Sequence, residues 1–317
     1  MTINIRGDGV AARCCAHLLH PVACERTSRP RIPVIMLSEA AQGLIRDIFQ
    51  KDDLFRDLPR IRKRVVAWGP DSMPVELDHS AVIVSEEALL SSLGVKEEVS
   101  GDADWTVCAA PPLPVSTTEH RFGERMATPI PVKLRASEDT CWMESVEDGW
   151  LFLNSGWLIA VGAPPETLLE QSRLVKNHID GFDSGTACFP ASPRMVTPLG
   201  GDGWICCGSA AMSFDPLCGD GTAHAVREAI LASAVIRAIA RGEEPGPLLA
   251  HYEARLTAGF ERHLMHCLQF YSSGGSGAWW IAQAESVKQG LAWCRRRMEG
   301  HGRFRYRLHG LELQPIE

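Results

Sequence analysis

The sequence of 317 residues lacks the marks of several large classes of protein. Its 32 Lys and Arg residues are outnumbered by 39 Asp and Glu residues, so the net charge at pH 7 is −7. Because nucleic-acid binding depends on an excess of positive charge, we expect no nucleic-acid partner. No apolar run is long enough for a signal peptide or a membrane span. We therefore expect a cytoplasmic protein that has no contact with a membrane.

Cysteine is plentiful, but the patterns that would indicate a metal site or a disulfide framework are missing. None of the 11 cysteines belongs to a Cys-x-x-Cys pair, which excludes the usual zinc and iron–sulfur motifs. Their number is odd, and most lie within apolar segments, as at Cys14, Cys15, Cys206 and Cys207. These features predict buried free thiols in a reducing compartment, and no metal site.

The N-terminus contains a short apolar segment followed by the motif Gly7-x-Gly9-x-x-Ala12. This spacing is typical of a strand–turn–helix unit that binds a dinucleotide. In such a unit Gly7 forms the turn, Gly9 leaves room for the pyrophosphate, and Ala12 lets the helix lie close to the strand. The sequence therefore predicts a dinucleotide-binding fold that begins at the first residues.

A second strand, predicted over residues 21–25, ends in an acidic residue. Glu25 is therefore a candidate acceptor for a ribose 2′-hydroxyl, although it follows Ala12 at a shorter distance than usual. Arg26 comes next and is either a phosphate contact or part of a solvated loop.

Residues 204–221 form a second glycine-bearing segment that precedes a predicted helix over residues 222–241. A predicted strand over 204–207 ends at Gly208, where no Cβ obstructs a bound molecule. Main-chain amides near the helix N-terminus favour negative charge, such as that of a reduced flavin. The predicted contacts of this segment with a flavin are made by Gly208, Ser209, Asp215, Pro216, Gly219, Asp220 and Gly221.

Residues 130–162 change to the pattern of an antiparallel meander with short polar turns. Such a sheet can cover a flavin and provide the walls of a substrate pocket. Trp142, Trp150 and Phe152 are candidates for these walls, or core residues. Glu144 is a candidate general base, or a solvent-facing carboxylate. Arg194 is a candidate contact to flavin or an oxyanion, or a surface arginine.

Both glycine segments together resemble the superfamily of FAD-dependent aromatic hydroxylases and tryptophan halogenases. Within it, four stretches are most similar to LodB-like and GoxB-like flavoproteins, which mature the cysteine tryptophylquinone of partner amino-acid oxidases. These stretches are residues 37–40, 104–107, 141–145 and 214–221.

This resemblance implies a flavin-dependent monooxygenase that binds FAD, consumes O2 and oxidises a peptidyl tryptophan in the precursor of a partner oxidase. It implies that Pro216 stabilises the reduced flavin and shields it from water, and that Arg46, on a helix beside the flavin, contacts it. NAD(P)H would bind only transiently as a reductant, since no second nucleotide motif is present.

Two departures limit the resemblance. Ser209 stands where the superfamily usually has an aspartate that holds the ribityl hydroxyls, and the halogenase motif Gly-Trp-x-Trp-x-Ile-Pro is absent from the nearest segment, residues 149–155. The second departure argues against halogenation. Two further functions stay open: hydroxylation of a free small aromatic compound, and a non-redox role as an FAD-bearing assembly factor for the oxidase.

The predicted fold is α/β, with a Rossmann-like FAD-binding domain, an inserted antiparallel substrate sheet and C-terminal helices, as in hydroxybenzoate hydroxylase. The expected domains are residues 1–112 with 186–245 for FAD, 113–185 for the substrate, and 246–317 for a helical cap.

Overall fold

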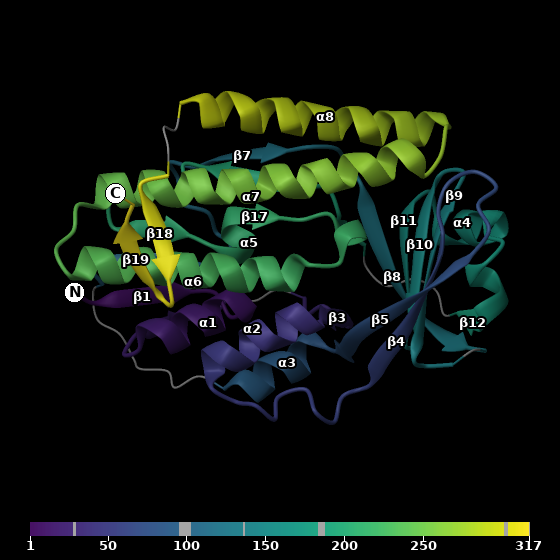
Figure 1. Cartoon of the computed structure of the whole chain (residues 1–317), viewed down its shortest axis with the longest axis horizontal. Coiled ribbons are helices and arrows are strands. Elements are labelled where there is room, and N and C mark those ends of the chain that lie inside the picture. The colour runs from purple at the N-terminus through teal and green to yellow at the C-terminus, as the bar shows by residue number, and fades with distance from the viewer. Residues whose placement is uncertain (28–29, 95–102, 136, 183–187, 301–303, 317) are drawn as a thin grey trace.

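The computed structural model describes residues 1–27, 30–94, 103–135, 137–182, 188–300 and 304–316. Two sheets form the two halves of the molecule, and long helices from the last third of the chain cover the first of them (Figure 1).

The smaller of the two principal sheets has five strands in the order β15-β16-β6-β1-β2, and the pairings among β2, β1, β6 and β16 are parallel. Its alternation of strands with helices gives the predicted dinucleotide-binding topology. The strands are β1 (Ile3–Arg6), β2 (Ala23–Glu25), β6 (Trp105–Cys108), β15 (Gly200–Gly201) and β16 (Trp204–Cys206).

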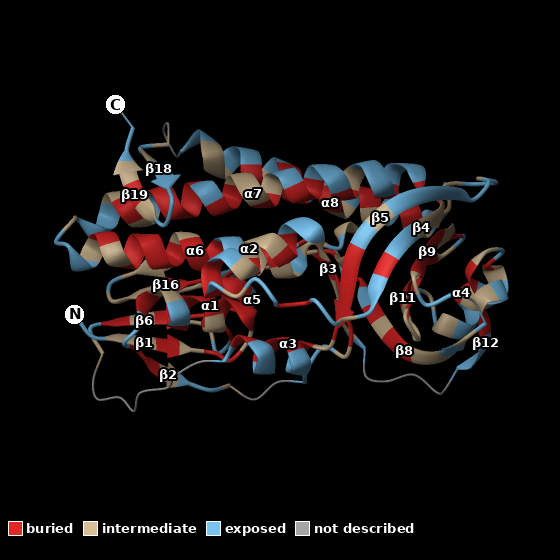
Figure 2. Ribbon diagram, turned by 60° about the horizontal axis from the view of Figure 1, so that its bottom comes forward, coloured by how far each residue is buried: buried red, intermediate tan, exposed pale blue. Residues whose placement is uncertain are grey.

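Two helices pack closely against each other beside this sheet: α1 (Val10–Leu19) and α6 (Gly221–Ala240). Small residues make this close approach possible, since Ala12 of α1 and Ala229 of α6 are both buried. Figure 2 shows α6 buried along much of its length. A central helix of this kind holds the second glycine segment in a fixed position.

The larger sheet has nine strands, eight of them in the order β12-β8-β11-β10-β9-β4-β5-β3, with β13 paired to β8. Its first members along the chain are β3 (Ile35–Ser38), β4 (Arg60–Ala67) and β5 (Val75–Val84). The others are β8 (Met126–Leu134), β9 (Thr140–Val146), β10 (Gly149–Asn154), β11 (Trp157–Gly162), β12 (Ile179–Phe182) and β13 (Phe189–Pro190).

The meander of β8 to β11 is antiparallel, as its turn sequences predict. However, β9 also pairs in parallel with β4, so three strands before residue 112 extend the same sheet. The sheet boundary therefore does not coincide with the expected division at residue 112, because strand pairing joined segments far apart in sequence. The division into domains stays a prediction.

Shorter helices connect the strands: α2 (Glu39–Phe49), α3 (Glu86–Leu93), α4 (Pro165–Gln171) and the 3-10 helix η1 (Val175–His178). The Ser38 side chain caps α2 by accepting the Ala41 N–H. Between α4 and η1 the chain turns at Ser172. The hydroxyl of Ser172 donates to Glu144 and accepts the N–H of Lys176, which favours a turn.

After α6, the chain forms the antiparallel helices α7 (Pro245–Ser273) and α8 (Ala278–Glu299), which lie over α6 in Figure 1. A three-stranded sheet of β17 (Met212–Ser213), β14 (Arg194–Thr197) and β7 (Thr118–Arg121) and a hairpin of β18 (Tyr306–His309) and β19 (Glu312–Pro315) complete the described fold. Of the described helices, none combines the length and apolar composition needed to cross a bilayer.

Candidate active site at the junction of the two sheets

A cavity of about 360 Å³ lies where the two halves meet. The nucleotide-binding half contributes both glycine segments to it, and the nine-stranded sheet contributes mostly apolar side chains. The glycines that line it are Gly9, Gly208, Gly219 and Gly221. Two turns separated by some 200 residues therefore face one common space.

Glycine is required at two of the turns. Gly7 has a φ of +133°, and a Cβ there would lie 3.1 Å from the amide nitrogen of Ala110. Gly208 has a φ of +54°, and a Cβ there would lie 2.6 Å from the Cβ of Ala11 at the start of α1. Both positions thus combine left-handed backbone with contact to a neighbouring segment. Ala12, inside α1, is buried.

Ser209 lines the cavity beside Gly208, but its hydroxyl donates to the carbonyl of Ala109 at 3.3 Å. Glu228 of α6 faces the same region and is only 4% exposed. The Gly208 N–H donates to its carboxyl group, while its Oε2 lacks a hydrogen-bond partner among the described residues. Burial raises the pKa of Glu228 well above its ordinary value, against the opposing effects of Gly208 and Arg194. Glu228 therefore offers a buried carboxyl oxygen without a partner in the described structure, in the cavity that Ser209 also lines.

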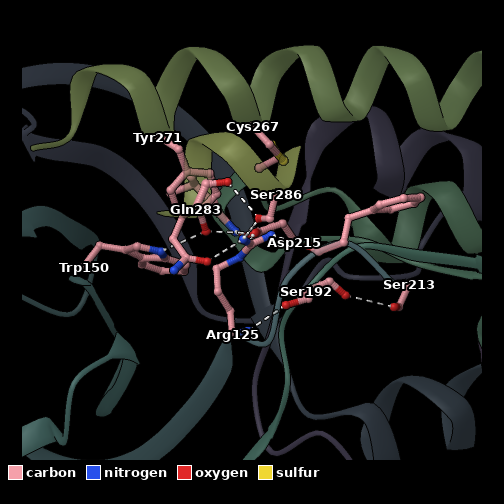
Figure 3. Close-up of polar contacts among 12 residues, drawn as sticks. Arg125, Trp150, Ser192, Ser213, Asp215, Cys267, Tyr271, Gln283 and Ser286 are labelled. Carbon is pink, nitrogen blue, oxygen red and sulfur yellow. Dashed lines mark hydrogen bonds and ion pairs between the residues drawn. The ribbon is translucent and has the colours of Figure 1, made fainter. Parts of the chain in front are cut away.

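Pro216 begins the 3-10 helix η2 (Pro216–Cys218), which forms one edge of the cavity. Asp215, just before it, was expected to contact the cofactor. Instead its Oδ1 accepts the Leu217 N–H at 3.0 Å, and its Oδ2 accepts from Arg125 at 3.0 Å and from Tyr271 at 2.8 Å (Figure 3). Although Asp215 lines the cavity, protein donors occupy its oxygens, and its role is to hold the Pro216 loop.

Arg125 is the centre of this buried network, and it was not among the predicted site residues. Besides Asp215, its guanidinium donates to Gln283 at 2.8 Å and Ser286 at 3.2 Å, both on α8 (Figure 3). The side chains of Arg125 and Asp215 are fully buried. Burial raises the pKa of Asp215, and the positive charge of Arg125 opposes this rise. No motif surrounds Arg125, so only the tertiary contacts reveal it.

The main-chain amides of η2 are also used within the protein. The Cys218 N–H donates to the Asp215 carbonyl at 3.4 Å, and the Gly219 N–H donates to the Pro216 carbonyl at 3.0 Å. Gly219 was predicted to contact the flavin, but its N–H is used in this way. The amides left for a ligand are therefore those of the first turn of α6, at Gly221 and Thr222, which both line the cavity.

The nine-stranded sheet forms an aromatic wall. Trp150 and Phe152 are two residues apart in β10, so they share one face of the sheet, and both line the cavity. They are two of the three residues proposed as walls of the substrate pocket. Phe152 is paired with Met143 of β9 on one side and Ile159 of β11 on the other, and both also line the cavity. Trp150 is 1% exposed, and its indole N–H donates to the Tyr271 hydroxyl at 3.4 Å.

Trp142 and Glu144 lie on the opposite face of β9, so their predicted roles at the substrate are corrected. Trp142 stacks on His178, with ring centroids 4.6 Å apart. The buried Glu144 carboxylate accepts four hydrogen bonds, from the Ser172 hydroxyl and the N–H groups of Arg173, Leu174 and Val175. It is neither a base at the cavity nor solvent-facing. It caps the turn before η1.

Other candidate residues lie outside the cavity. The Arg194 guanidinium donates to the Ser209 carbonyl and pairs with Glu119 at 3.4 Å. It therefore holds the backbone next to Gly208 without lining the cavity itself. Asp220 pairs with Arg227 at 2.9 Å.

Glu25 ends β2, next to the Gly7 turn, and its carbonyl accepts the Gly7 N–H at 2.8 Å. Arg46 lies in the last turn of α2. Neither residue lines the cavity, and neither does Arg26. The cofactor contacts predicted for these three residues stay predictions.

A second hollow of about 780 Å³ adjoins the cavity along α6 and α7 and shares seven lining residues with it. We call it the arginine groove. Two acids, Asp220 and Glu228, line it, against four arginines: Arg64, Arg227, Arg255 and Arg262. Within the described part of the chain, neither Arg255 nor Arg262 forms an ion pair. The groove is therefore positively charged in a protein whose net charge is negative.

One cluster in the described residues has the chemistry of metal ligands: Cys218, His263 and Cys267. The two sulfur atoms lie 3.8 Å apart, and His263 Nε2 lies 3.3 Å from the sulfur of Cys267. However, His263 Nε2 also accepts the Asp215 N–H at 2.9 Å, and burial lowers the pKa of His263 to about 3. The imidazole thus serves the Asp215 loop, and we assign no metal here.

Two glycine turns on a parallel sheet and an aromatic wall from a second sheet thus line the cavity, and the chain shares this fold with solved structures of FAD-dependent halogenases and of monooxygenases. No protein-family model matches the sequence, and no curated protein matches it. Solved structures do match the fold.

Three of these structures illustrate the similarity. The peptidyl tryptophan dihydroxylase QhpG, described as essential for tryptophylquinone cofactor biogenesis, is 20% identical with a TM-score of 0.70, over 99% of this chain and 86% of QhpG. The myxobacterial chondrochloren halogenase CndH is 16% identical with a TM-score of 0.74, over 95% and 90% of the two chains. The p-nitrophenol 4-monooxygenase PnpA of Pseudomonas putida is 13% identical with a TM-score of 0.66, over 94% and 96%.

Proposed function

We propose that this protein is an FAD-dependent monooxygenase. The observation that carries the proposal is the convergence of Gly9, Gly208 and Gly219 on one cavity. The Gly208 turn leaves a cradle that a Cβ would obstruct, and Glu228 Oε2, unpaired in the described structure, suits a ribityl hydroxyl. Gly7, Gly9 and Ala12 would accommodate the pyrophosphate, and the first turn of α6 would face the pyrimidine edge of the flavin.

When bound and reduced, FAD activates O2 and supplies an electrophilic oxygen atom to an electron-rich ring. The protein's own contribution is positioning and exclusion of water. Arg125, Asp215 and Tyr271 hold Pro216 at the edge of the cavity. Trp150, Phe152 and Met143 form an apolar wall that keeps water from the reacting region. Among its described residues, the nine-stranded sheet presents no carboxylate to the cavity, because the Glu144 side chain binds the turn before η1. The proposed oxygenation therefore relies on a substrate ring that is itself electron-rich.

The proposed substrate is a peptidyl tryptophan in the precursor of a partner amino-acid oxidase that carries a tryptophylquinone. QhpG, which shares the fold, acts on peptidyl tryptophan. The arginine groove supports a polypeptide substrate, because an open, positively charged hollow beside the cavity can hold an acidic segment. NAD(P)H is the proposed transient reductant. All 11 cysteines are free thiols, which supports the proposal of a cytoplasmic protein.

The first test is FAD binding. Saturating FAD should raise the unfolding temperature, since FAD at 100 times its Kd stabilises a protein by about 2.7 kcal/mol. An unchanged unfolding temperature together with a colourless protein would contradict the flavin assignment.

The second test is activity. The FAD-loaded protein, the oxidase precursor, NADH or NADPH and O2 are incubated, and the precursor peptide is analysed by mass spectrometry. We expect added oxygen on one tryptophan, and none in a precursor with phenylalanine at that position. Oxidation of the nicotinamide that depends on free aromatic compounds but not on the precursor would favour the free-substrate hydroxylase. Binding of the precursor without any oxygenation would favour the assembly factor.

A further inference from the structure

The sheet wall of the cavity contains one buried acceptor that the protein leaves unused. Asn154, the last residue of β10, is 2% exposed and lines the cavity. Its Oδ1 has no hydrogen-bond partner within the described structure. Because a buried acceptor without a partner is costly, a ligand that donates a hydrogen bond is the simplest explanation for retaining it.

The surroundings of Asn154 indicate the shape of this ligand. Trp150, Phe152 and Asn154 alternate along β10 and share the face toward the cavity. Met143 and Ile159 flank Phe152 on the neighbouring strands. The wall is therefore apolar over two rows of side chains and polar at its end. A flat aromatic ring with one donor on its edge matches this arrangement.

The other polar groups on this wall cannot replace Asn154. Arg64 lines the cavity but only donates hydrogen bonds, and the Trp150 N–H is directed to Tyr271. Among the described residues, the other fully buried side-chain acceptor of the cavity without a partner is Glu228 Oε2, which lies next to Gly208 on the side of the glycine turns. Of the described side chains that the nine-stranded sheet presents to the cavity, Asn154 is thus the one with a free acceptor.

We infer that Asn154 Oδ1 accepts a hydrogen bond from the indole N–H of the substrate tryptophan while the ring lies along Phe152 and Met143. The inference rests on the proposed function, because it concerns the substrate side of the same cavity. The hydrogen bond selects an indole over rings without a donor. It also fixes which edge of the indole points away from the flavin, and so determines the carbon atoms that face it.

Two ring compounds of the same shape test the inference. 3-Methylindole has the N–H, whereas 3-methylbenzofuran has an oxygen atom in its place. Binding of each to the oxidised, FAD-loaded protein is measured by calorimetry without any reductant. We expect the wild-type protein to prefer 3-methylindole by about tenfold, which is the effect of one hydrogen bond of about 1.4 kcal/mol.

Variants separate this role from packing. Asn154→Leu and the smaller Asn154→Ala should abolish the preference, and the result from either folded variant suffices. Asn154→Asp retains an acceptor and should keep the preference. Phe152→Leu is the matched control on the same strand, because it should weaken both compounds equally and leave their ratio unchanged.

Three results would overturn the inference: no preference in the wild-type protein, a preference that survives Asn154→Leu, or a variant that loses FAD affinity while its ratio stays unchanged. The last would identify Asn154 as a flavin contact. These measurements involve no turnover. A failure to oxygenate the oxidase precursor would therefore contradict the proposed function and leave the indole preference as a separate result.

Discussion

The two walls of the cavity recognise ligands by different means. On the nucleotide-binding side, the shape is set by main chain: Gly7 and Gly208 have positive φ values, and a Cβ would be in tight contact with a neighbouring segment at Gly7 and would clash at Gly208. On the side of the nine-stranded sheet, the shape is set by side chains that strand register brings together, such as Trp150, Phe152 and Asn154.

This difference has a consequence for specificity. In the proposed function the main-chain cradle binds the flavin nucleotide, which is the same for every substrate. A wall of side chains can be changed one residue at a time without disturbing the parallel sheet. The Arg125 network connects the two, since it joins the Pro216 loop to α8 and, through Tyr271, to Trp150.

Removing this connection should have the largest effect. Arg125→Met leaves the buried Asp215 carboxylate without its cationic partner and should lower the free energy of unfolding by about 3–5 kcal/mol. Chemical denaturation measures the change. Arg173→Met is the matched control, because its pair with Asp71 is exposed and should contribute at most about 1 kcal/mol. Equal effects of the two substitutions would show that the network does not support the loop.

An intermediate effect is expected at the main-chain cradle. Gly208→Ala places a side chain at a φ of +54° and against Ala11, which should lower stability by about 2–3 kcal/mol and FAD affinity at least tenfold. Gly310→Ala has a similar φ of +58° but nothing within 4 Å of its Cβ, so it isolates the backbone strain. Thermal unfolding and FAD titration measure both. Equal losses of stability and of FAD affinity in the two variants would show that the contact between residue 208 and Ala11 has no effect of its own.

The smallest effect is expected at Glu228, a side chain that lines the cavity beside the Gly208 turn. Burial raises the pKa of Glu228 and so favours its protonated form, which a glutamine resembles in shape and hydrogen bonding, so Glu228→Gln should bind FAD nearly as well as the wild-type protein. Glu228→Leu removes the hydrogen bond and should weaken FAD binding by roughly tenfold, or about 1.4 kcal/mol. Titration of both variants and the wild-type protein with FAD measures the difference. A large loss in the Gln variant would mean that the ionised form is needed.

Several parts of the fold could be predicted from local sequence. The strand and helix around Gly7, Gly9 and Ala12 and the strand before Gly208 formed as expected, because glycine spacing and apolar runs act over a few residues. Trp150 and Phe152, two of the predicted wall residues, both line the cavity, and their contact with a substrate stays a prediction. Each of these features depends on neighbours along the chain.

Other parts could not be predicted, because they depend on pairing between distant segments. Alternation could not tell which face of β9 would meet the cavity, so Trp142 and Glu144 were assigned to the wrong side. The partners of the Asp215 carboxylate, Arg125 and Tyr271, are distant in the sequence and could not be predicted, and the cofactor contact of Asp215 stays a prediction. Glu228 gave no signal in sequence, because its position in α6 matters only once α6 lies against the Gly208 turn.

The sequence by itself therefore determined where the backbone can turn tightly, which segments form helices and strands, and that two glycine turns are available for a nucleotide. Tertiary structure alone decided which side chains complete the cavity and which are consumed in holding it together. The physical reason is that glycine acts through the conformation of its own residue, whereas an acid, an amide or an indole acts through the partner that the fold places beside it.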